Sequence, residues 1–208
     1  MSDPRTELVG RSYNVIGDQF VEWRDRIIGD PRGWWVEQLV SRLPGDARVL
    51  ELGCGNGIPD TKELAQRFRV TGVDISPEQV RKARANVPEA EFVVGDFTSL
   101  QLEPSSYDAV TAFYSFNHVP RDLLASLLAD IRSWLVPGGL LLAAFGTSDT
   151  EGWTGRWLAD TPMFFSSFPP ETNSRLVDDA GFERLLDEVI TLQEPDGEGT
   201  FQWVLARR

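Results

Sequence analysis

The amino-acid sequence predicts an α/β fold: a doubly wound, mostly parallel sheet with helices on both faces and an antiparallel strand in a C-terminal hairpin. Three observations lead to this prediction. Strand-like and helix-like segments alternate between residues 45 and 145, an order typical of right-handed crossovers between parallel strands. Leu140 to Phe145 (LLLAAF) is apolar at every position, as expected of a strand covered on both faces. Two strand-like segments joined by a short turn end the sequence, and such a hairpin makes at least one of its strands antiparallel.

The individual elements follow from hydrophobic spacing and from start and stop signals. Ser76-Pro77-Glu78-Gln79 has the form of a capping box with proline at the first helical position, so a helix begins there. Leu123, Leu127 and Ile131 recur at intervals of four in the helix that follows Pro120. The expected strands are residues 47–52, 70–74, 92–94, 108–114, 140–145, 183–190 and 200–206, and helices are also expected around residues 13–28, 31–44, 60–67 and 172–180.

Composition limits the kinds of partner. The sequence has 208 residues, enough for one domain, with 32 acidic against 20 basic side chains and a formal net charge of −12. That charge argues against nucleic acid or an anionic membrane surface as the partner. Cys54 is the single cysteine, so we expect neither an intramolecular disulfide nor a cysteine metal cluster, and no metal site. Without a recognisable leader or a bilayer-length apolar stretch, we expect a cytoplasmic protein, monomeric or homodimeric.

The loop after the first expected strand carries the clearest functional signal. Residues 50–59 read LELGCGNGIP, with three glycines in five positions. In an open parallel sheet, ligands bind at the carboxyl ends of the strands, and glycine lets them approach the main chain. A dinucleotide fingerprint would need glycine where Ile58 stands, and a phosphate-binding loop would need Gly-Lys-Ser/Thr, which is absent. A nicotinamide-dependent oxidoreductase is therefore disfavoured.

Glu51 to Gly57 (ELGCGNG) resembles the first motif of the class I S-adenosylmethionine-dependent methyltransferases, of the type that acts on small molecules. Further segments resemble later motifs of the same family in the same order: Val73-Asp74, Gly95-Asp96-Phe97, YDAV at 107–110, LVPGG at 135–139 and the terminal hairpin. Together they cover roughly residues 45–208. The resemblance implies a Rossmann-like sheet, S-adenosylmethionine as cofactor and S-adenosylhomocysteine (SAH) as product.

The same resemblance implies roles for individual residues. Asp74, at the carboxyl end of the second strand, would accept hydrogen bonds from both ribose hydroxyls. Asp96 would accept from the adenine amine, beside the apolar surface of Phe97. Glu51 would either steady the glycine loop or hold the amine of the methionine portion. The full set expected to bind the cofactor is Glu51, Gly53, Cys54, Gly55, Gly57, Asp74, Ile75, Asp96, Phe97 and Phe113.

The methyl acceptor is expected near the single histidine. His118 lies just past the fourth strand, within SFNHVP, and an imidazole titrates near neutral pH. It is a candidate general base or substrate-orienting residue; the alternative is a loop histidine that bonds only to backbone. Tyr114 and Asn117 are weaker polar candidates. Tyr13 belongs to a lead-in, YNVIGDQF, that resembles the segment folded over the cofactor in small-molecule methyltransferases.

Residues 146–170 join the fifth strand to the next helix and are rich in aromatic side chains. Long connections at this edge of a sheet often cover a substrate, and Trp153, Trp157 and Phe164 are therefore expected to contact the acceptor. A local core beneath the loop is the alternative. A single domain is expected, divided into N-terminal helices over the site (1–44), a cofactor-binding core (45–145), a substrate cap loop (146–170) and a C-terminal helix and hairpin (171–208).

The function predicted from these features is transfer of a methyl group to an oxygen or nitrogen of a small-molecule metabolite. The alternative is a non-catalytic S-adenosylmethionine-binding protein that acts as a sensor or assembly partner. The two hypotheses differ in whether the acceptor side of the cofactor is accessible.

Overall fold

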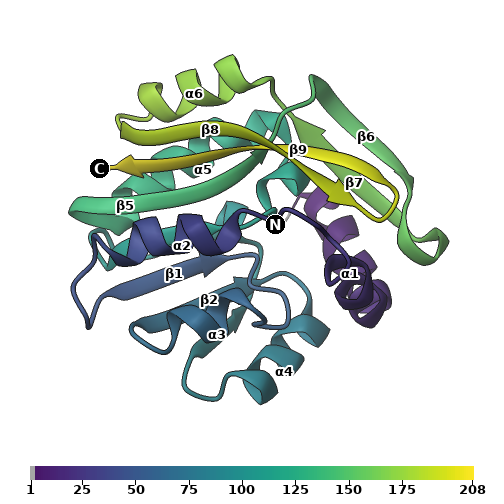
Figure 1. The fold of residues 1–208 in the computed structure, drawn as a ribbon, viewed down its shortest axis with the longest axis horizontal. Coiled ribbons are helices and arrows are strands. Elements are labelled where there is room, and N and C mark those ends of the chain that lie inside the picture. Colours follow the sequence, from purple (N-terminus) through teal and green to yellow (C-terminus); the bar gives the residue numbers. More distant parts are fainter. Residues whose placement is uncertain (1–2) are drawn as a thin grey trace.

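The computed structural model describes residues 3–208 and confirms the predicted fold class (Figure 1). Within these residues, seven strands form one sheet in the order β3-β2-β1-β4-β5-β9-β8. Strands β1 to β5 pair in parallel, and β9 runs antiparallel to both β5 and β8. The strand order reverses between β1 and β4, which is where open α/β sheets bind ligands. The strands are β1 (Arg48–Leu52), β2 (Arg69–Asp74), β3 (Glu91–Val94), β4 (Tyr107–Ala112), β5 (Leu135–Gly146), β8 (Glu183–Glu194) and β9 (Gly197–Arg207).

Helices cover both faces of the sheet, as expected. On one face, Leu128 and Val177 belong to a buried cluster beneath α5 and α6. On the other face, Trp35 and Leu64 pack with Trp203 of β9 beneath α2 and α3. The helices are α1 (Pro4–Arg24), α2 (Arg32–Val40), α3 (Asp60–Leu64), α4 (Pro77–Asn86), α5 (Arg121–Trp134) and α6 (Pro170–Asp179).

The helix starts follow their capping chemistry. Ser76 caps α4 as predicted, since its side chain accepts a hydrogen bond from the Gln79 N–H. The same signature occurs at the first helix, where the Asp3 side chain accepts from the Arg5 N–H and Pro4 occupies the first turn. Helix α1 therefore begins at Pro4 and ends at Arg24, whereas the sequence analysis expected residues 13–28.

The expected cap loop at residues 146–170 contains an antiparallel hairpin. Strands β6 (Thr150–Arg156) and β7 (Pro162–Ser167) pair with each other, apart from the main sheet. The hairpin packs against α1 through a buried cluster that includes Ile16 and Met163. Helix α1 and the hairpin lie together on the right of Figure 1, next to the carboxyl ends of the parallel strands.

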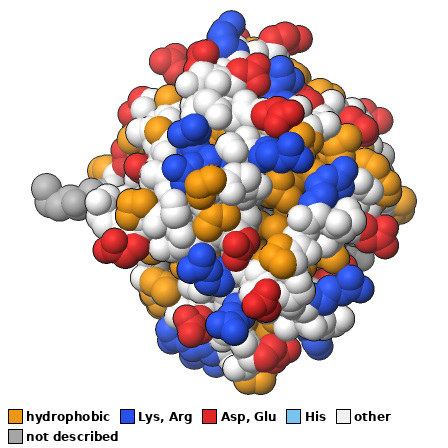
Figure 2. Space-filling view, turned by 90° about the vertical axis from the view of Figure 1, so that its left-hand side faces the viewer, with side chains coloured by type: hydrophobic (Ala, Val, Ile, Leu, Met, Phe, Trp, Pro, Cys, Tyr) orange, Lys and Arg blue, Asp and Glu red, His pale blue; other side chains and the backbone are white. Residues whose placement is uncertain are grey.

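Figure 2 shows the opposite side, at the left of Figure 1, where the parallel strands begin. Acidic, basic and apolar side chains are interspersed there. Among residues 3–208, no helix combines the length and the apolar character needed to cross a membrane.

Candidate cofactor and acceptor site

A cavity opens at the carboxyl ends of β1 to β4, beneath α1. The empty space within it is about 940 Å³, a volume that includes open solvent at its mouth. Helix α1 and the loops after β1, β2, β3 and β4 contribute its walls. Most of the residues singled out from the sequence line it: Tyr13, Gly53, Cys54, Gly55, Asp74, Ile75, Asp96, Phe97, Phe113, Tyr114 and His118.

The glycine loop brings backbone to the cavity wall. Gly53 has a φ of +78°, and its N–H donates to the Val73 carbonyl oxygen at 2.8 Å. A Cβ on Gly53 would lie 2.5 Å from the Cβ of Ser115, so a side chain fits neither the backbone nor the space. Burial raises the pKa of the Cys54 thiol well above its usual range, which keeps the thiol protonated and unreactive.

Asp74 at the end of β2 is held by the backbone on both sides. Its two carboxylate oxygens accept hydrogen bonds from the Gly55 and Ser76 N–H groups, each at 2.8 Å. Burial raises the pKa of Asp74 to about 6, against those two hydrogen bonds, which lower it. Each oxygen keeps a further lone pair, so the carboxylate can also accept from a pair of vicinal hydroxyls.

Asp96 follows β3 and is held by side-chain hydroxyls as well. One of its oxygens accepts from the N–H and hydroxyl of Thr98, and the other accepts from the Thr6 hydroxyl of α1 at 2.6 Å. Thr6 also lines the cavity, although the sequence analysis did not single it out. Its partner lies 90 residues away, and no local pattern marks such a contact.

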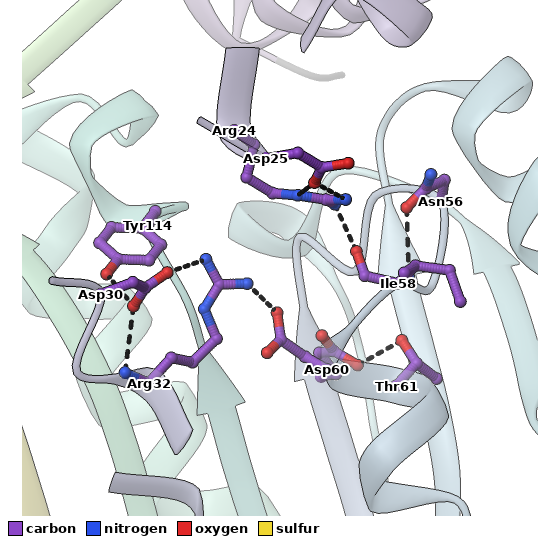
Figure 3. Close-up of polar contacts among 10 residues, drawn as sticks. Arg24, Asp25, Asp30, Arg32, Asn56, Ile58, Asp60, Thr61 and Tyr114 are labelled. Carbon is purple, nitrogen blue, oxygen red and sulfur yellow. Dashed lines mark hydrogen bonds and ion pairs between the residues drawn. The ribbon is translucent and has the colours of Figure 1, made fainter. Parts of the chain in front are cut away.

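A buried ion-pair cluster lies at another part of the cavity wall (Figure 3). The Arg32 guanidinium donates to Asp60 at 2.6 Å and to Asp30 at 2.9 Å. Tyr114 adopts a φ of +54°, an unusual value for an aromatic residue. Its hydroxyl donates to Asp30 at 2.7 Å, and its ring lies 4.9 Å from the Arg32 guanidinium carbon. Neighbouring Arg24 donates to the Ile58 carbonyl oxygen.

Two atoms of this cluster are buried without a partner among the described residues: Nε of Arg32 and Oδ1 of Asp60. Both residues line the cavity. An unpaired buried polar atom costs roughly 1–3 kcal/mol, so the cluster fits a ligand that carries an acceptor for Arg32 and a donor for Asp60. A carboxylate and an ammonium on one carbon, as in the methionine portion of S-adenosylmethionine, supply both. The residues present therefore fit the expected cofactor.

Glu51 lies outside the cavity lining, beneath the glycine loop. It is 2% exposed and accepts a hydrogen bond from the Thr61 hydroxyl of α3 at 2.6 Å. Burial, together with the negative charge of Asp60, raises the pKa of Glu51 to about 8. Its hydrogen bond is therefore with α3, and its side chain is not part of the cavity wall.

His118, in the loop after β4, meets Tyr13 of α1 in the cavity lining. Nε2 of His118 is 3.0 Å from the Tyr13 hydroxyl oxygen, and Nδ1 is 2.8 Å from the Phe164 carbonyl oxygen. The Phe165 ring packs on the imidazole, with the ring centres 4.8 Å apart. Burial lowers the pKa of His118 to about 4, so the imidazole is neutral at physiological pH.

The remaining residues expected at the site do not line the cavity. Phe164 is buried under α1, Trp157 packs edge-on against Trp23, and Trp153 is half exposed. Asn117 lies beside Gly146 at the start of the hairpin segment, and Gly57 faces α4. Aromatic side chains of the hairpin pack against α1 and form a local core with it. Such a core beneath the loop was the alternative to direct contact with the acceptor. Residues 146–170 contact the site at His118, through the Phe164 carbonyl oxygen and the Phe165 ring.

Comparisons with known proteins identify related chains and similar folds. The family model described as "Methyltransferase domain" matches residues 49–139. An uncharacterized methyltransferase from Synechocystis is 31% identical over 181 residues, covering 71% of this chain and 82% of that protein. The ubiquinone biosynthesis O-methyltransferase of Xanthomonas campestris is 38% identical over 104 residues, covering 48% of this chain and 42% of that protein. The chain thus spans less than half the length of that relative.

Among solved structures, the DhpI–SAH complex has a TM-score of 0.75 and 21% sequence identity, covering 100% of this chain and 98% of that chain. At this identity, the likeness concerns the fold. Taken with the sequence relatives, it shows that the chain belongs to the class I S-adenosylmethionine-dependent methyltransferase family. Within residues 3–208, no group of three or more His, Cys, Asp or Glu side chains is arranged to hold a metal ion.

Proposed function

We propose that this chain transfers a methyl group from S-adenosylmethionine to a small hydroxylated or amino compound. The observation that carries the proposal is that one cavity holds buried groups suited to both ends of this cofactor. Asp74 and Asp96 suit the ribose and adenine, and the unpaired atoms of Arg32 and Asp60 suit the amino-acid end.

The charge balance of the cavity supports the same cofactor. Two guanidinium groups (Arg24 and Arg32) and three carboxyl groups (Asp60, Asp74 and Asp96) line it, so two positive and three negative charges leave a net of −1 when all are ionised. A pyrophosphate would meet repulsion there, whereas a sulfonium cation is attracted.

When bound, S-adenosylmethionine supplies an electrophilic methyl group, and the carbon–sulfur electron pair stays on sulfur. The residues of the chain hold and orient the reactants, and such positioning alone is worth about 7–11 kcal/mol. Val9, Tyr13 and Phe20 of α1 cover the cavity with largely apolar surface, which excludes water from the acceptor side.

A hydroxyl oxygen is the favoured acceptor atom. The Xanthomonas relative is named for O-methylation in ubiquinone biosynthesis. Val9, Phe20 and Val119 are apolar, whereas Tyr13 and His118 offer polar atoms in the same lining. This combination suits a compact apolar or aromatic molecule with one hydroxyl or amino group to be methylated.

The first test is thermal unfolding with S-adenosylmethionine, SAH or NAD in large excess. A ligand at about 100 times its dissociation constant adds about 2.7 kcal/mol, a shift of roughly 5–10 °C for a chain of this size. We expect shifts with the first two ligands only; a shift with NAD alone would overturn the proposal. Methyl transfer from methyl-labelled cofactor to a panel of phenols, hydroquinones and amines then identifies the acceptor. Cofactor binding without transfer to any compound would favour the non-catalytic alternative.

Gly53→Ala gives this test a matched variant pair. Alanine at Gly53 would need an unfavourable φ and a Cβ 2.5 Å from Ser115, so we expect SAH affinity to fall about 100-fold or more, with stability lower by roughly 1–3 kcal/mol. Gly33→Ala is the control, because Gly33 is exposed in α2 with open space around its Cβ position. It is expected to leave SAH affinity unchanged and to stabilise α2 slightly. Calorimetric titration of both variants gives the comparison.

A further inference from the structure

The Tyr13–His118 pair has a defined direction of hydrogen bonding. The Phe164 carbonyl oxygen can only accept, so Nδ1 of His118, 2.8 Å away, carries the imidazole proton. In the neutral ring, Nε2 is then an acceptor, and the Tyr13 hydroxyl at 3.0 Å donates to it. Burial raises the pKa of Tyr13, so the phenol keeps the proton that it donates.

This direction decides which atom an acceptor meets. Tyr13 and His118 both line the cavity, but Nε2 of His118 is already engaged by Tyr13. Because the Tyr13 proton points toward His118, the oxygen lone pairs of Tyr13 remain available on the cavity side. His118 therefore acts on the cavity through Tyr13.

The pair is held in this arrangement from several sides. The His118 ring packs against Phe165, and the Tyr13 ring meets Phe20 edge-on at 5.4 Å. From β7, the atoms that face His118 are the Phe164 carbonyl oxygen and the Phe165 ring.

The charged groups nearby come from other elements. Asp74, across the cavity, helps to raise the pKa of Tyr13. Arg5 of α1 lies over the Phe164 ring, and Arg121 of α5 donates to the Ser167 carbonyl oxygen and to Asp149. Within the described chain, the polar contacts of the His118 ring are the Tyr13 hydroxyl and the Phe164 carbonyl oxygen.

We propose that Tyr13 is the residue that contacts the methyl acceptor, and that His118 positions Tyr13 and receives its proton. This inference rests on the proposed function and specifies its acceptor: a neutral group that carries a hydrogen, such as a hydroxyl or an amine. A carboxylate has no hydrogen to donate and would meet the lone pairs of Tyr13.

The acceptor X–H gives its proton to the Tyr13 oxygen while its electron pair stays on X, ready to form the new bond to carbon. Tyr13 passes its own proton to Nε2 of His118 and remains a neutral phenol. His118 becomes an imidazolium that donates from Nδ1 to the Phe164 carbonyl oxygen and from Nε2 to Tyr13, and it then releases one proton to water. Burial disfavours the imidazolium and therefore favours that release.

The single histidine allows a direct test by NMR. In tag-free protein labelled with ¹⁵N-histidine and saturated with SAH, every histidine signal comes from His118. We expect the Nδ1-protonated tautomer, with no titration between about pH 5.5 and pH 9. Protonation of Nε2, or titration near the ordinary histidine value of 6.5, would overturn the inference. Failure of SAH to bind would instead count against the proposed function, since the tautomer can be read without it.

Phenol and benzoate then probe the acceptor contact in the SAH complex. Phenol is expected to shift the Nε2 resonance of wild type through Tyr13, whereas benzoate is not. Tyr13→Phe should abolish the phenol response while preserving the Nδ1-protonated tautomer and SAH affinity within about twofold. Tyr107→Phe is the matched control, because Tyr107 begins β4 and packs on the core outside the cavity. An unchanged Nε2 resonance with phenol, or an equal response in Tyr13→Phe, would contradict a contact through Tyr13.

Discussion

Two groups of acids at or beside this cavity are stabilised in different ways. Asp74 and Asp96 accept hydrogen bonds from neutral donors: nearby N–H groups, the Thr98 hydroxyl and the Thr6 hydroxyl. Asp60 and Asp30 depend on one cation, Arg32, which is itself 9% exposed. In the first group every carboxylate oxygen has a partner, whereas in the second Oδ1 of Asp60 and Nε of Arg32 have none among the described residues.

The difference separates a site that is complete before a ligand binds from one that a ligand would complete. Backbone N–H groups hold Asp74 without ordering any donor side chain, so this carboxylate is preorganised. In the ion-pair cluster, Arg32, Asp60 and Asp30 each lose contact with water, which costs free energy. The attraction among the three charges offsets only part of that cost. A zwitterionic ligand would recover part of that free energy.

Replacing Arg32 tests the dependence of the second group on a single cation. Arg32→Leu removes the ion pairs of the buried Asp60 and the partly buried Asp30, so we expect the free energy of unfolding to fall by roughly 3–5 kcal/mol. Arg48→Leu is the control, because its ion pair with Asp108 is half exposed and such pairs contribute little. Urea unfolding of both variants measures the contrast. Equal losses of unfolding free energy in the two variants would show that the Arg32 ion pairs contribute no more than the half-exposed pair of Arg48.

The double variant Arg32→Leu with Asp60→Leu sharpens this result. Removing the second charge leaves one acid fewer without a partner, so the double variant should be more stable than Arg32→Leu alone. Asp30 keeps its hydrogen bond from Tyr114 in both variants. A double variant less stable than Arg32→Leu would contradict an unpaired Asp60 as the cause of the loss.

Asp74→Asn tests the preorganised group. An asparagine has one acceptor oxygen, so its amide would face one of the two N–H groups that now donate to Asp74. We expect SAH affinity to fall about 10- to 100-fold, or roughly 1.4–2.7 kcal/mol, with a smaller loss of stability. Calorimetric titration measures the affinity, and exposed Asp46→Asn serves as control.

The pH dependence of binding sharpens the same comparison. The pKa of Asp74 is about 6 in the folded chain, so protonation removes an acceptor as pH falls through that value. Wild-type SAH affinity should decline from about pH 7 to about pH 5, and the affinity of Asp74→Asn should change much less. A parallel decline in both proteins would assign the effect to another group.

Glu51→Gln addresses a third kind of acid, which is buried outside the cavity lining and accepts from Thr61. Its pKa is about 8 when folded, against 4.5 ordinarily, so between these values the unfolded chain is ionised while the folded chain keeps the proton. Stability is therefore lost as pH rises through this window, and the loss is complete above about pH 8. Glutamine can still accept from Thr61 and removes this loss. We expect Glu51→Gln to gain roughly 1–2 kcal/mol over wild type at about pH 9, and less at about pH 6.

Urea unfolding of wild type and Glu51→Gln at the two pH values measures this gain. A difference that does not grow with pH would contradict a raised pKa for Glu51. Glu63→Gln is the control: Glu63 is an exposed residue of α3, and its substitution should have a small effect at either pH.

The same division explains which parts of the site were predictable from sequence. Asp74 and Asp96 follow short strands, and their partners lie mostly within two residues or in the adjacent glycine loop, so motif and spacing suffice to place them. Arg32 and Asp60 are 28 residues apart and look like ordinary residues at helix starts. Only the tertiary fold brings them together, so the sequence analysis named neither residue.

The fold shows the same contrast. The parallel sheet and α4 follow from periodicity and local capping, and the structure confirms them. The start of α1 was also predictable, because Asp3-Pro4 repeats the signal of Ser76-Pro77. The β6–β7 hairpin was missed, since its strands alternate weakly and its aromatic residues are buried by a helix from the other end of the sequence.

Thr6→Val, with the smallest expected effect, tests the contact of the preorganised group that spans the greatest sequence separation, 90 residues. Valine keeps the shape of threonine but removes the hydroxyl that donates to Asp96 at 2.6 Å. We expect stability to fall by about 1 kcal/mol. SAH affinity should change by less than about threefold, since the Thr98 contacts still hold Asp96. Hydrogen exchange should accelerate in α1 but not in β1 or β4. A large loss of SAH affinity would instead make the adenosine end dependent on α1, and Asp96 would then resemble Asp60 more than Asp74.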